Sequence, residues 1–178
     1  DKGFAVTAVE PNDAMRAIGV ERTSGRDVRW VEALAETTGL PSAAYKLAAF
    51  GSSFNVTDRP AALAEAHRLL VPGGLFACIW NHRDLTDPVQ ARLEAVITRH
   101  IPDYDYGARR ADQTEVIRAS GLFTDIRPLA GRILHRQDIE DVVEAWRSHA
   151  TLERQAGDRF AAIVADIESV LRSLDRNA

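Results

Sequence analysis

Apolar residues along the chain form short continuous runs and stripes at helical spacing, and the two patterns alternate over the first half. A continuous run is typical of a strand that is buried on both faces of a parallel sheet. A stripe that repeats every three to four residues predicts a helix with one buried face. The runs that predict strands are residues 4–9, 27–31, 47–50 and 75–80.

Residues 47–80 show the fullest pattern: a strand, a loop, a helix, a sharp turn and a second strand. Asp58 suits the N-cap of that helix, and Pro60 suits its first turn. A Pro-Gly-Gly sequence at 72–74 ends the helix. We therefore expect a right-handed βαβ unit, and with it an α/β fold in which helices flank a parallel sheet.

The second half of the chain is predicted to be mainly helical. Helices are expected at 89–100, 114–120, 138–149 and 151–174, the last interrupted near Gly157, and further strands at 122–129 and 132–136. The helices after residue 138 carry apolar stripes. These stripes predict packing in the core or at a subunit interface, and in the second case a homo-oligomer.

Composition narrows the class of protein. The 178 residues are 46% hydrophobic and 27% charged, which suits one globular domain with a sizeable core. The net charge of −4 provides no basic field, so we expect neither a nucleic-acid nor a membrane partner. No apolar stretch approaches the roughly 18 residues of a membrane span, and no signal peptide is visible. The single cysteine, Cys78, lies in an apolar run, which predicts an inert thiol and a cytoplasmic protein.

The sequence Leu-Val-Pro-Gly-Gly-Leu at 70–75 resembles the signature between strands four and five of Rossmann-like, class I methyltransferases, which use S-adenosylmethionine (SAM). Segments 6–15 and 35–41 match further family motifs in the right order. The resemblance implies a Rossmann-like sheet in a single methyltransferase domain over 1–178, with helical lid or insertion elements around 85–110 and 138–176. It also leads us to expect that the first βα unit, with the family's glycine-rich loop, and the last strand lie outside this sequence.

By this resemblance, Glu10 accepts hydrogen bonds from the two ribose hydroxyls of SAM, because it follows the strand at 4–9. A solvated carboxylate at a strand end is the alternative. Met15 stands where the family packs an apolar residue against adenine, and core packing is its alternative.

The segment 32–41 resembles the family's adenine-binding loop. Ala35 would offer its backbone N–H to the adenine ring, with Glu36 nearby. Leu34 takes the place of the aspartate that accepts from the adenine amine, so backbone groups or Glu36 would replace it, or the loop is structural. Phe50, at the end of the strand at 47–50, and Ser52, in the loop that follows, are candidate cofactor-binding residues. The small residues of this loop let the backbone approach the cofactor.

Three residues are candidates for the chemistry. Phe54 would wall the methyl-transfer pocket and Asn55 would orient a polar group of the substrate; the alternatives are a core role and a turn role. His82 follows the strand at 75–80 and is a candidate base or substrate contact, or else a surface histidine. The spacing of the polar residues at 81–87 is not distinctive, so we expect no metal.

Tyr104 and Tyr106 lie in a loop at 101–110 that would serve as a substrate lid, unless they pack on their own helix. His149 would reach the pocket, or would pack or cap a helix. We further expect the strand ends around 50–55 and 81–84 to converge on one pocket.

The chain shows no compelling general base, and an amine can attack SAM without one, so the sequence favours methyl transfer to an amine of a small molecule. Segments 52–55, 80–84 and 147–152 resemble antibiotic-tailoring N-methyltransferases, including those of the lincosamide type. The alternatives are a small-molecule O-methyltransferase, an NAD-binding dehydrogenase, whose ribose Glu10 would equally suit, and a non-catalytic methyltransferase-like subunit.

Overall fold

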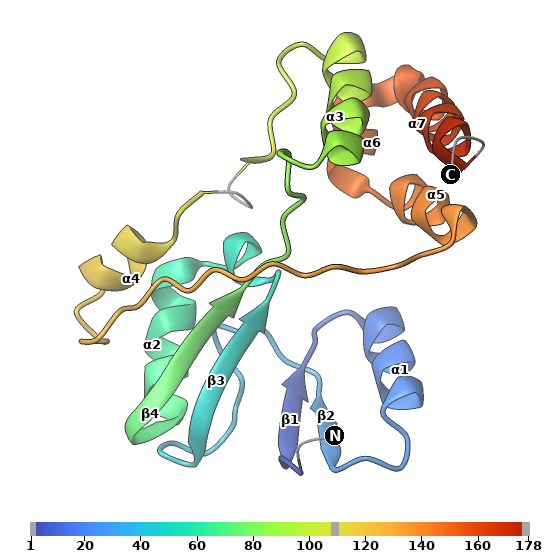
Figure 1. Cartoon of the computed structure of the whole chain (residues 1–178). Coiled ribbons are helices and arrows are strands. Elements are labelled where there is room, and N and C mark those ends of the chain that lie inside the picture. Colours follow the sequence, from blue (N-terminus) through green and yellow to red (C-terminus); the bar gives the residue numbers. More distant parts are fainter. Residues whose placement is uncertain (1–2, 108–110, 176–178) are drawn as a thin grey trace. The chain divides into compact units, whose positions relative to one another are not determined.

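The computed structural model describes residues 3–107 and 111–175, and the chain divides into two compact units. Unit 1 consists of Asp1–Trp80 and Ala111–Pro128, and unit 2 of Asn81–Arg110 and Leu129–Ala178. Unit 1 contains the strands, whereas unit 2 is helical (Figure 1). The predicted lid or insertion segments, as far as they are described, fall in unit 2.

The first part of unit 1 is a parallel strand pair with one helix. Strand β1 (Val6–Val9) pairs with β2 (Val28–Val31), and the pairing ends with Val9 opposite Val31. Helix α1 (Asp13–Arg22) connects them, and the Asn12 side chain caps it by accepting from the Met15 N–H. The helix lies close to β2 because Gly19 faces the indole of Trp30, where a Cβ atom would overlap the ring.

The second part of unit 1 is a βαβ unit, as predicted. Its helix ends at Leu69, however, and the Pro-Gly-Gly sequence expected to end the helix lies within the second strand. Strand β3 (Tyr45–Gly51), the 3₁₀ helix η1 (Phe54–Val56), helix α2 (Arg59–Leu69) and strand β4 (Leu70–Ile79) follow in order. The strands are parallel and end together, with Gly51 opposite Ile79. Asp58 caps α2 by accepting from the Ala61 N–H, as the sequence predicted.

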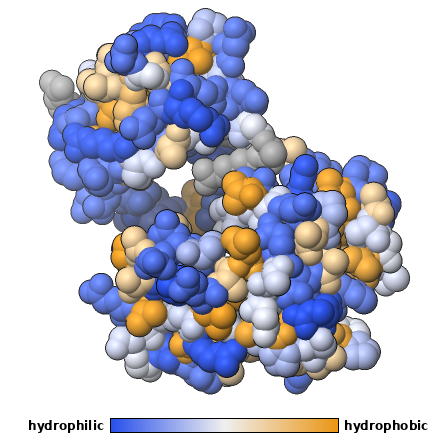
Figure 2. Space-filling view, turned by 180° about the vertical axis from the view of Figure 1, so that it is seen from behind, coloured by the Kyte–Doolittle hydropathy of each residue, from blue (hydrophilic) through white to orange (hydrophobic). Residues whose placement is uncertain are grey.

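The β3–β4 pair buries one face and exposes the other. On the buried face, Phe50, Phe76 and Cys78 pack around Phe54 and α2, and Phe123 stacks on Phe76 with ring centroids 5.0 Å apart. Helix α4 (Thr114–Ala119) packs against α2. The opposite face exposes Leu47, Leu75 and Ile79, and Figure 2 shows apolar side chains among hydrophilic ones on the molecular surface.

An ion pair between the buried Glu65 and the exposed Arg68 holds the loop before β3 to α2. The Glu65 carboxylate on α2 accepts from the Thr38 N–H at 2.9 Å and from the Thr38 hydroxyl at 2.5 Å. It also pairs with Arg68 at 2.7 Å, and Arg68 in turn donates to the Leu40 carbonyl. The hydrogen bond from Arg68, with those from Thr38, lowers the pKa of Glu65 to about 2, against the effect of burial.

Unit 2 is built from helices α3 (Pro88–His100), α5 (Ile139–Arg147), α6 (Ala150–Ala156) and α7 (Phe160–Asp175), with the short 3₁₀ helix η3 (Gly157–Arg159). Helix α7 packs on both α3 and α5. The break predicted near Gly157 is present, since this glycine has φ = +54° between α6 and α7. The largest fully buried side chains of the core are Leu93, Ile97, Val143, Leu152, Ile163 and Ile167.

Two predicted strands, at 122–129 and 132–136, were wrong. These residues are extended or irregular and pair with no other segment among those described. Leu129, Ile133 and Leu134 are largely exposed. Their apolar pattern resembles that of a strand, but a strand also needs a neighbour for its backbone hydrogen bonds. No helix over the described ranges is both long enough and apolar enough to cross a membrane.

Candidate functional site

The carboxyl ends of β1 and β2 form the first group of candidate residues. Glu10 directly follows β1, and its N–H donates to the Val31 carbonyl at 3.1 Å, which extends the pairing to the sheet edge. Its Oε1 accepts from the Asn12 N–H at 2.9 Å. Oε2 has no hydrogen-bond partner among the described residues, so one oxygen of the carboxylate is open to a ligand.

Arg16, which the sequence did not single out, fixes this turn. Its Nη1 donates to the Glu10 carbonyl at 2.9 Å. Its Nη2 bonds Asp13 at 2.6 Å and Glu32 at 3.0 Å, and Glu32 directly follows β2. One side chain from α1 therefore ties together the ends of both strands. The sequence held one indication of this role. Arg16 lies in the first turn of a helix that begins at residue 13, and so stays close to Glu10 along the chain.

The loop predicted to hold adenine is anchored to the start of α2. Glu36 Oε1 accepts from the Asp58 N–H at 2.8 Å, and the Leu34 carbonyl accepts from the Thr37 N–H at 3.1 Å. Ala35 packs against the Phe54 cluster. Glu36 thus has a structural partner, while its second carboxylate oxygen is not engaged by any described residue.

The carboxyl ends of β3 and β4 form the second group. The Ser52 N–H donates to the Ile79 carbonyl at 2.9 Å, and Ser52 has φ = +54°, a left-handed conformation that is strained for a residue other than glycine. The Asn55 Oδ1 accepts from the Trp80 indole at 3.1 Å. Strained backbone at a strand end is often found at ligand sites.

Phe54 is not at the surface of this edge. Its side chain is 0% exposed and packs edge-on against Phe50 and Phe76, with centroids 5.4 and 5.6 Å away. It therefore takes the core role that the sequence offered as its alternative. Phe50 belongs to the same aromatic cluster and contributes its backbone, rather than its ring, to the edge.

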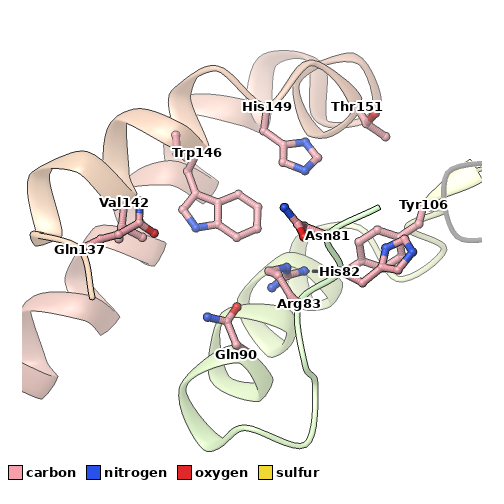
Figure 3. A pocket seen from close by; sticks show the side chains of 11 residues that line it. Asn81, His82, Arg83, Gln90, Tyr106, Gln137, Val142, Trp146, His149 and Thr151 are labelled. Carbon is pink, nitrogen blue, oxygen red and sulfur yellow. Dashed lines mark hydrogen bonds between the residues drawn. The ribbon is translucent and has the colours of Figure 1, made fainter. Parts of the chain in front are cut away.

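Residues of unit 2 enclose a pocket of about 310 Å³ (Figure 3). This volume lies at the lower end of the range for small-molecule sites. Figure 3 shows Trp146 and His149 reaching from α5 and the start of α6 toward Asn81 and Arg83. The lining residues are Asn81, His82, Arg83, Gln90, Tyr106, Gln137, Val142, Ala145, Trp146, His149 and Thr151.

Arg83 is the centre of the pocket's polar network. Its Nη2 pairs with Glu94 Oε2 and contacts the Tyr106 hydroxyl, each at 2.5 Å, and the Tyr106 hydroxyl also donates to Glu94. Its guanidinium lies over the Trp146 ring, 4.8 Å from the centroid. Tyr104 packs edge-on behind Tyr106, with centroids 4.7 Å apart, so Tyr106 lines the pocket and Tyr104 supports it.

The two candidate histidines both line the pocket. His149 stacks on Trp146 at 5.3 Å and, as the N-cap of α6, accepts from the Leu152 N–H at Nδ1. It therefore both caps a helix and faces the pocket, two roles that the sequence had presented as alternatives. The sequence missed Arg83, Gln90 and Gln137, and it assigned Trp146 only to a packed face.

The strand-edge residues of unit 1 suit SAM. Met15 and Leu34 are 61% and 58% exposed, although both are apolar, and both follow the ends of the β1–β2 pair. Exposed apolar side chains and a carboxylate after the same strand pair are the groups that an adenosine requires, because its base needs apolar contacts and its ribose needs an acceptor. Among the residues described, no three histidine, cysteine or carboxylate groups gather as they would around a metal ion.

Comparison with known proteins agrees with this geometry. Residues 1–78 match the sequence model of a family described as "Methyltransferase domain". The chain is 34% identical over 133 residues to a ubiquinone/menaquinone biosynthesis C-methyltransferase, UbiE, of Caulobacter vibrioides. The aligned region covers 72% of this chain and 52% of that protein. The UbiE protein of Methylobacterium nodulans is 38% identical over 87 residues, covering 45% of this chain and 34% of that protein. The chain thus spans about half or less of the length of these curated relatives.

A solved structure confirms the fold class. A protein assigned as a type II methyltransferase from Anaeromyxobacter dehalogenans superposes with a TM-score of 0.57 at 23% identity, covering 94% of this chain and 70% of that one. The parallel strand pairs with crossing helices are accordingly a Rossmann-like methyltransferase fold. The family match over residues 1–78, the curated relatives and the shared fold thus make the chain similar to class I, SAM-dependent methyltransferases.

Proposed function

We propose that the protein containing this chain transfers a methyl group from SAM to a small molecule. The observation that carries the proposal lies in the segments that follow β1 and β2 in unit 1. Glu10 has one carboxylate oxygen without a described partner there, and Met15 and Leu34 expose apolar side chains. SAM supplies a methyl group on a positively charged sulfur. The chain's own residues would hold its adenosine: Glu10 the ribose, and Met15, Leu34 and Ala35 the base.

Calorimetric titration of the full-length protein with SAM tests this proposal. SAM should bind, and Glu10→Ala should weaken binding by about 1–3 kcal/mol, the range for loss of charge-assisted hydrogen bonds. Glu21→Ala, which removes an exposed carboxylate from the last turn of α1, is the matched control and should leave affinity unchanged. Binding of NAD in place of SAM would support a dehydrogenase instead. Absence of both would support a non-catalytic subunit.

An amine nitrogen is the first candidate for the acceptor atom. The sequence predicts it because no general base is compelling, and a neutral amine can attack SAM unaided. The narrower assignment to antibiotic-tailoring, lincosamide-type N-methyltransferases rests on three short segments around 52–55, 80–84 and 147–152. A cytoplasmic location and a homo-oligomer remain predictions of the same kind.

A ring carbon is the second candidate, because the curated relatives are named as C-methyltransferases of ubiquinone and menaquinone biosynthesis. His82 separates the acceptor classes. His82→Ala should reduce turnover only mildly if a neutral amine is the nucleophile. It should abolish turnover, with SAM binding intact, if a hydroxyl must be deprotonated to attack or to activate a ring. Fragmentation mass spectrometry of the product then locates the methyl group.

A further inference from the structure

The pocket of unit 2 is lined mainly by uncharged polar side chains. Three of them are amides, Asn81, Gln90 and Gln137, and each offers both a donor and an acceptor. Thr151 adds a hydroxyl with the same double capacity. Among the described lining residues, only Val142 and Ala145 are purely aliphatic. A ligand for this pocket must therefore carry several groups that both donate and accept hydrogen bonds.

Two buried atoms of the lining indicate which hydrogen-bonding groups the ligand must carry. Arg83 Nη1 and Gln90 Oε1 are both buried, and neither has a hydrogen-bond partner among the described residues. One is a donor and the other an acceptor. Leaving such atoms unpaired is unfavourable, so a bound molecule that supplies an acceptor to Arg83 and a donor to Gln90 is stabilised by both.

The charges of the pocket favour a neutral molecule. None of the lining side chains that the structure describes is a carboxylate, so an ammonium group would find no counter-charge there. The Arg83 guanidinium is already balanced by Glu94 at 2.5 Å, and Tyr106 shares that carboxylate. Arg83 is thus a fixed hydrogen-bond donor with little net charge to attract an anion.

The aromatic walls complete the description. The Trp146 and Tyr106 rings line the pocket, and both are fixed, Trp146 by stacking with His149 and Tyr106 by Tyr104 and Glu94. Rigid aromatic walls can pack against the C–H face of a saturated ring, while the amides bond its substituents. A volume of about 310 Å³ limits the occupant to a small molecule.

We infer that the unit 2 pocket binds a neutral, polyhydroxylated ring of sugar size. A hydroxyl oxygen accepts from Arg83 Nη1, and a hydroxyl of the same ring donates to Gln90 Oε1. The inference rests on the proposed function only where it takes the bound ring to be part of the methyl acceptor. Binding of the ring itself requires no SAM.

The test uses the full-length protein without SAM. Its indole N–H resonances are followed by NMR during titration with the methyl glycosides of glucose, galactose and mannose. Trp146→Phe assigns the Trp146 signal. At least one glycoside should shift that signal saturably, and cyclohexylmethanol, a ring of similar size with one hydroxyl, should bind at least tenfold more weakly.

Gln90→Met keeps the side chain's length and removes its acceptor. It should weaken glycoside binding about fivefold, with the circular dichroism spectrum unchanged. Arg92→Met, on the exposed side of α3, is the control and should leave binding unchanged. The inference is overturned if no glycoside shifts the Trp146 signal, if cyclohexylmethanol binds as well as the glycosides, or if Gln90→Met has no effect. SAM titration of the same sample is a separate measurement. The proposed function can therefore fail or hold independently of glycoside binding.

Discussion

The guanidinium of Arg16 donates to the main-chain oxygen of Glu10 at 2.9 Å, and so a side chain of α1 fixes the turn that presents the candidate ribose carboxylate. The same guanidinium reaches Glu32 at the end of β2. The geometry of Glu10 therefore depends on a residue that need not touch the cofactor.

Arg16→Met should weaken SAM binding about tenfold, because the turn carrying Glu10 loses its support while the carboxylate remains. Calorimetry provides the measurement. Arg29→Met, at an exposed position of β2, should leave the dissociation constant unchanged. An Arg16→Met protein with wild-type affinity would show that the hydrogen bonds of Glu10 with Val31 and Asn12 position it without Arg16.

Glu65 should make the protein less stable in acid. Its pKa is lowered to about 2 in the folded state from 4.5 in the unfolded chain, so its stabilising contribution is complete above pH 4.5. It is lost as the pH falls from there toward 2. Glu65→Gln should lower the free energy of unfolding by about 1–3 kcal/mol at pH 7, and by much less near pH 2. Urea denaturation at both pH values measures the difference.

The exposed Glu21 provides the comparison for this experiment. Glu21→Gln should change the unfolding free energy little at either pH. A Glu65→Gln effect of equal size at pH 7 and near pH 2 would mean that packing, rather than ionisation, accounts for the contribution of this side chain.

Cys78 should react very slowly with alkylating reagents. Burial raises the pKa of its thiol to about 12, so only about one molecule in 10⁴ carries the thiolate at pH 8. Labelling of the folded protein by N-ethylmaleimide should then be roughly 10³-fold slower than labelling in urea. Because the sequence has one cysteine, mass spectrometry reads the rate directly. Rapid labelling of the folded protein would contradict the burial.

Phe54→Ala should act through stability. Removing a fully buried phenylalanine typically costs about 3–5 kcal/mol, so the denaturant midpoint should fall sharply. Val56→Ala, in the same short helix but exposed, should have little effect. If turnover per folded molecule also collapsed for Phe54→Ala at low temperature, the pocket-wall role predicted from the sequence would regain support.

Local sequence signals identified the four strands described in unit 1, although they also predicted a strand from residue 122 that does not form. The Asp58 cap, the two runs that became β3 and β4, and the Glu10 strand end are each encoded within a few residues. These features depend on backbone propensities and nearby capping groups, so a single stretch of sequence contains the necessary information.

The pocket of unit 2 could not be predicted in this way. Arg83 and Trp146 are 63 positions apart, and neither lies in a pattern that points to the other. Trp146 occupies a regular apolar stripe, which indicates a buried face but not what packs on it. The failed strand at 132–136 has the opposite cause. Its local pattern is suitable, but no neighbouring strand satisfies its backbone among the described residues.

The close approach of Gly19 to the indole of Trp30 reverses a usual rule of protein engineering. Replacing a mid-helix glycine by alanine normally adds up to about 1 kcal/mol of stability. At this position the added methyl group would have to displace a tryptophan that is itself tied to Thr23 by a hydrogen bond of 3.0 Å. A consensus-guided or propensity-guided redesign of α1 would thus loosen the helix that carries Met15 and Arg16. A substitution meant to stabilise the protein would then weaken the proposed contacts with adenosine.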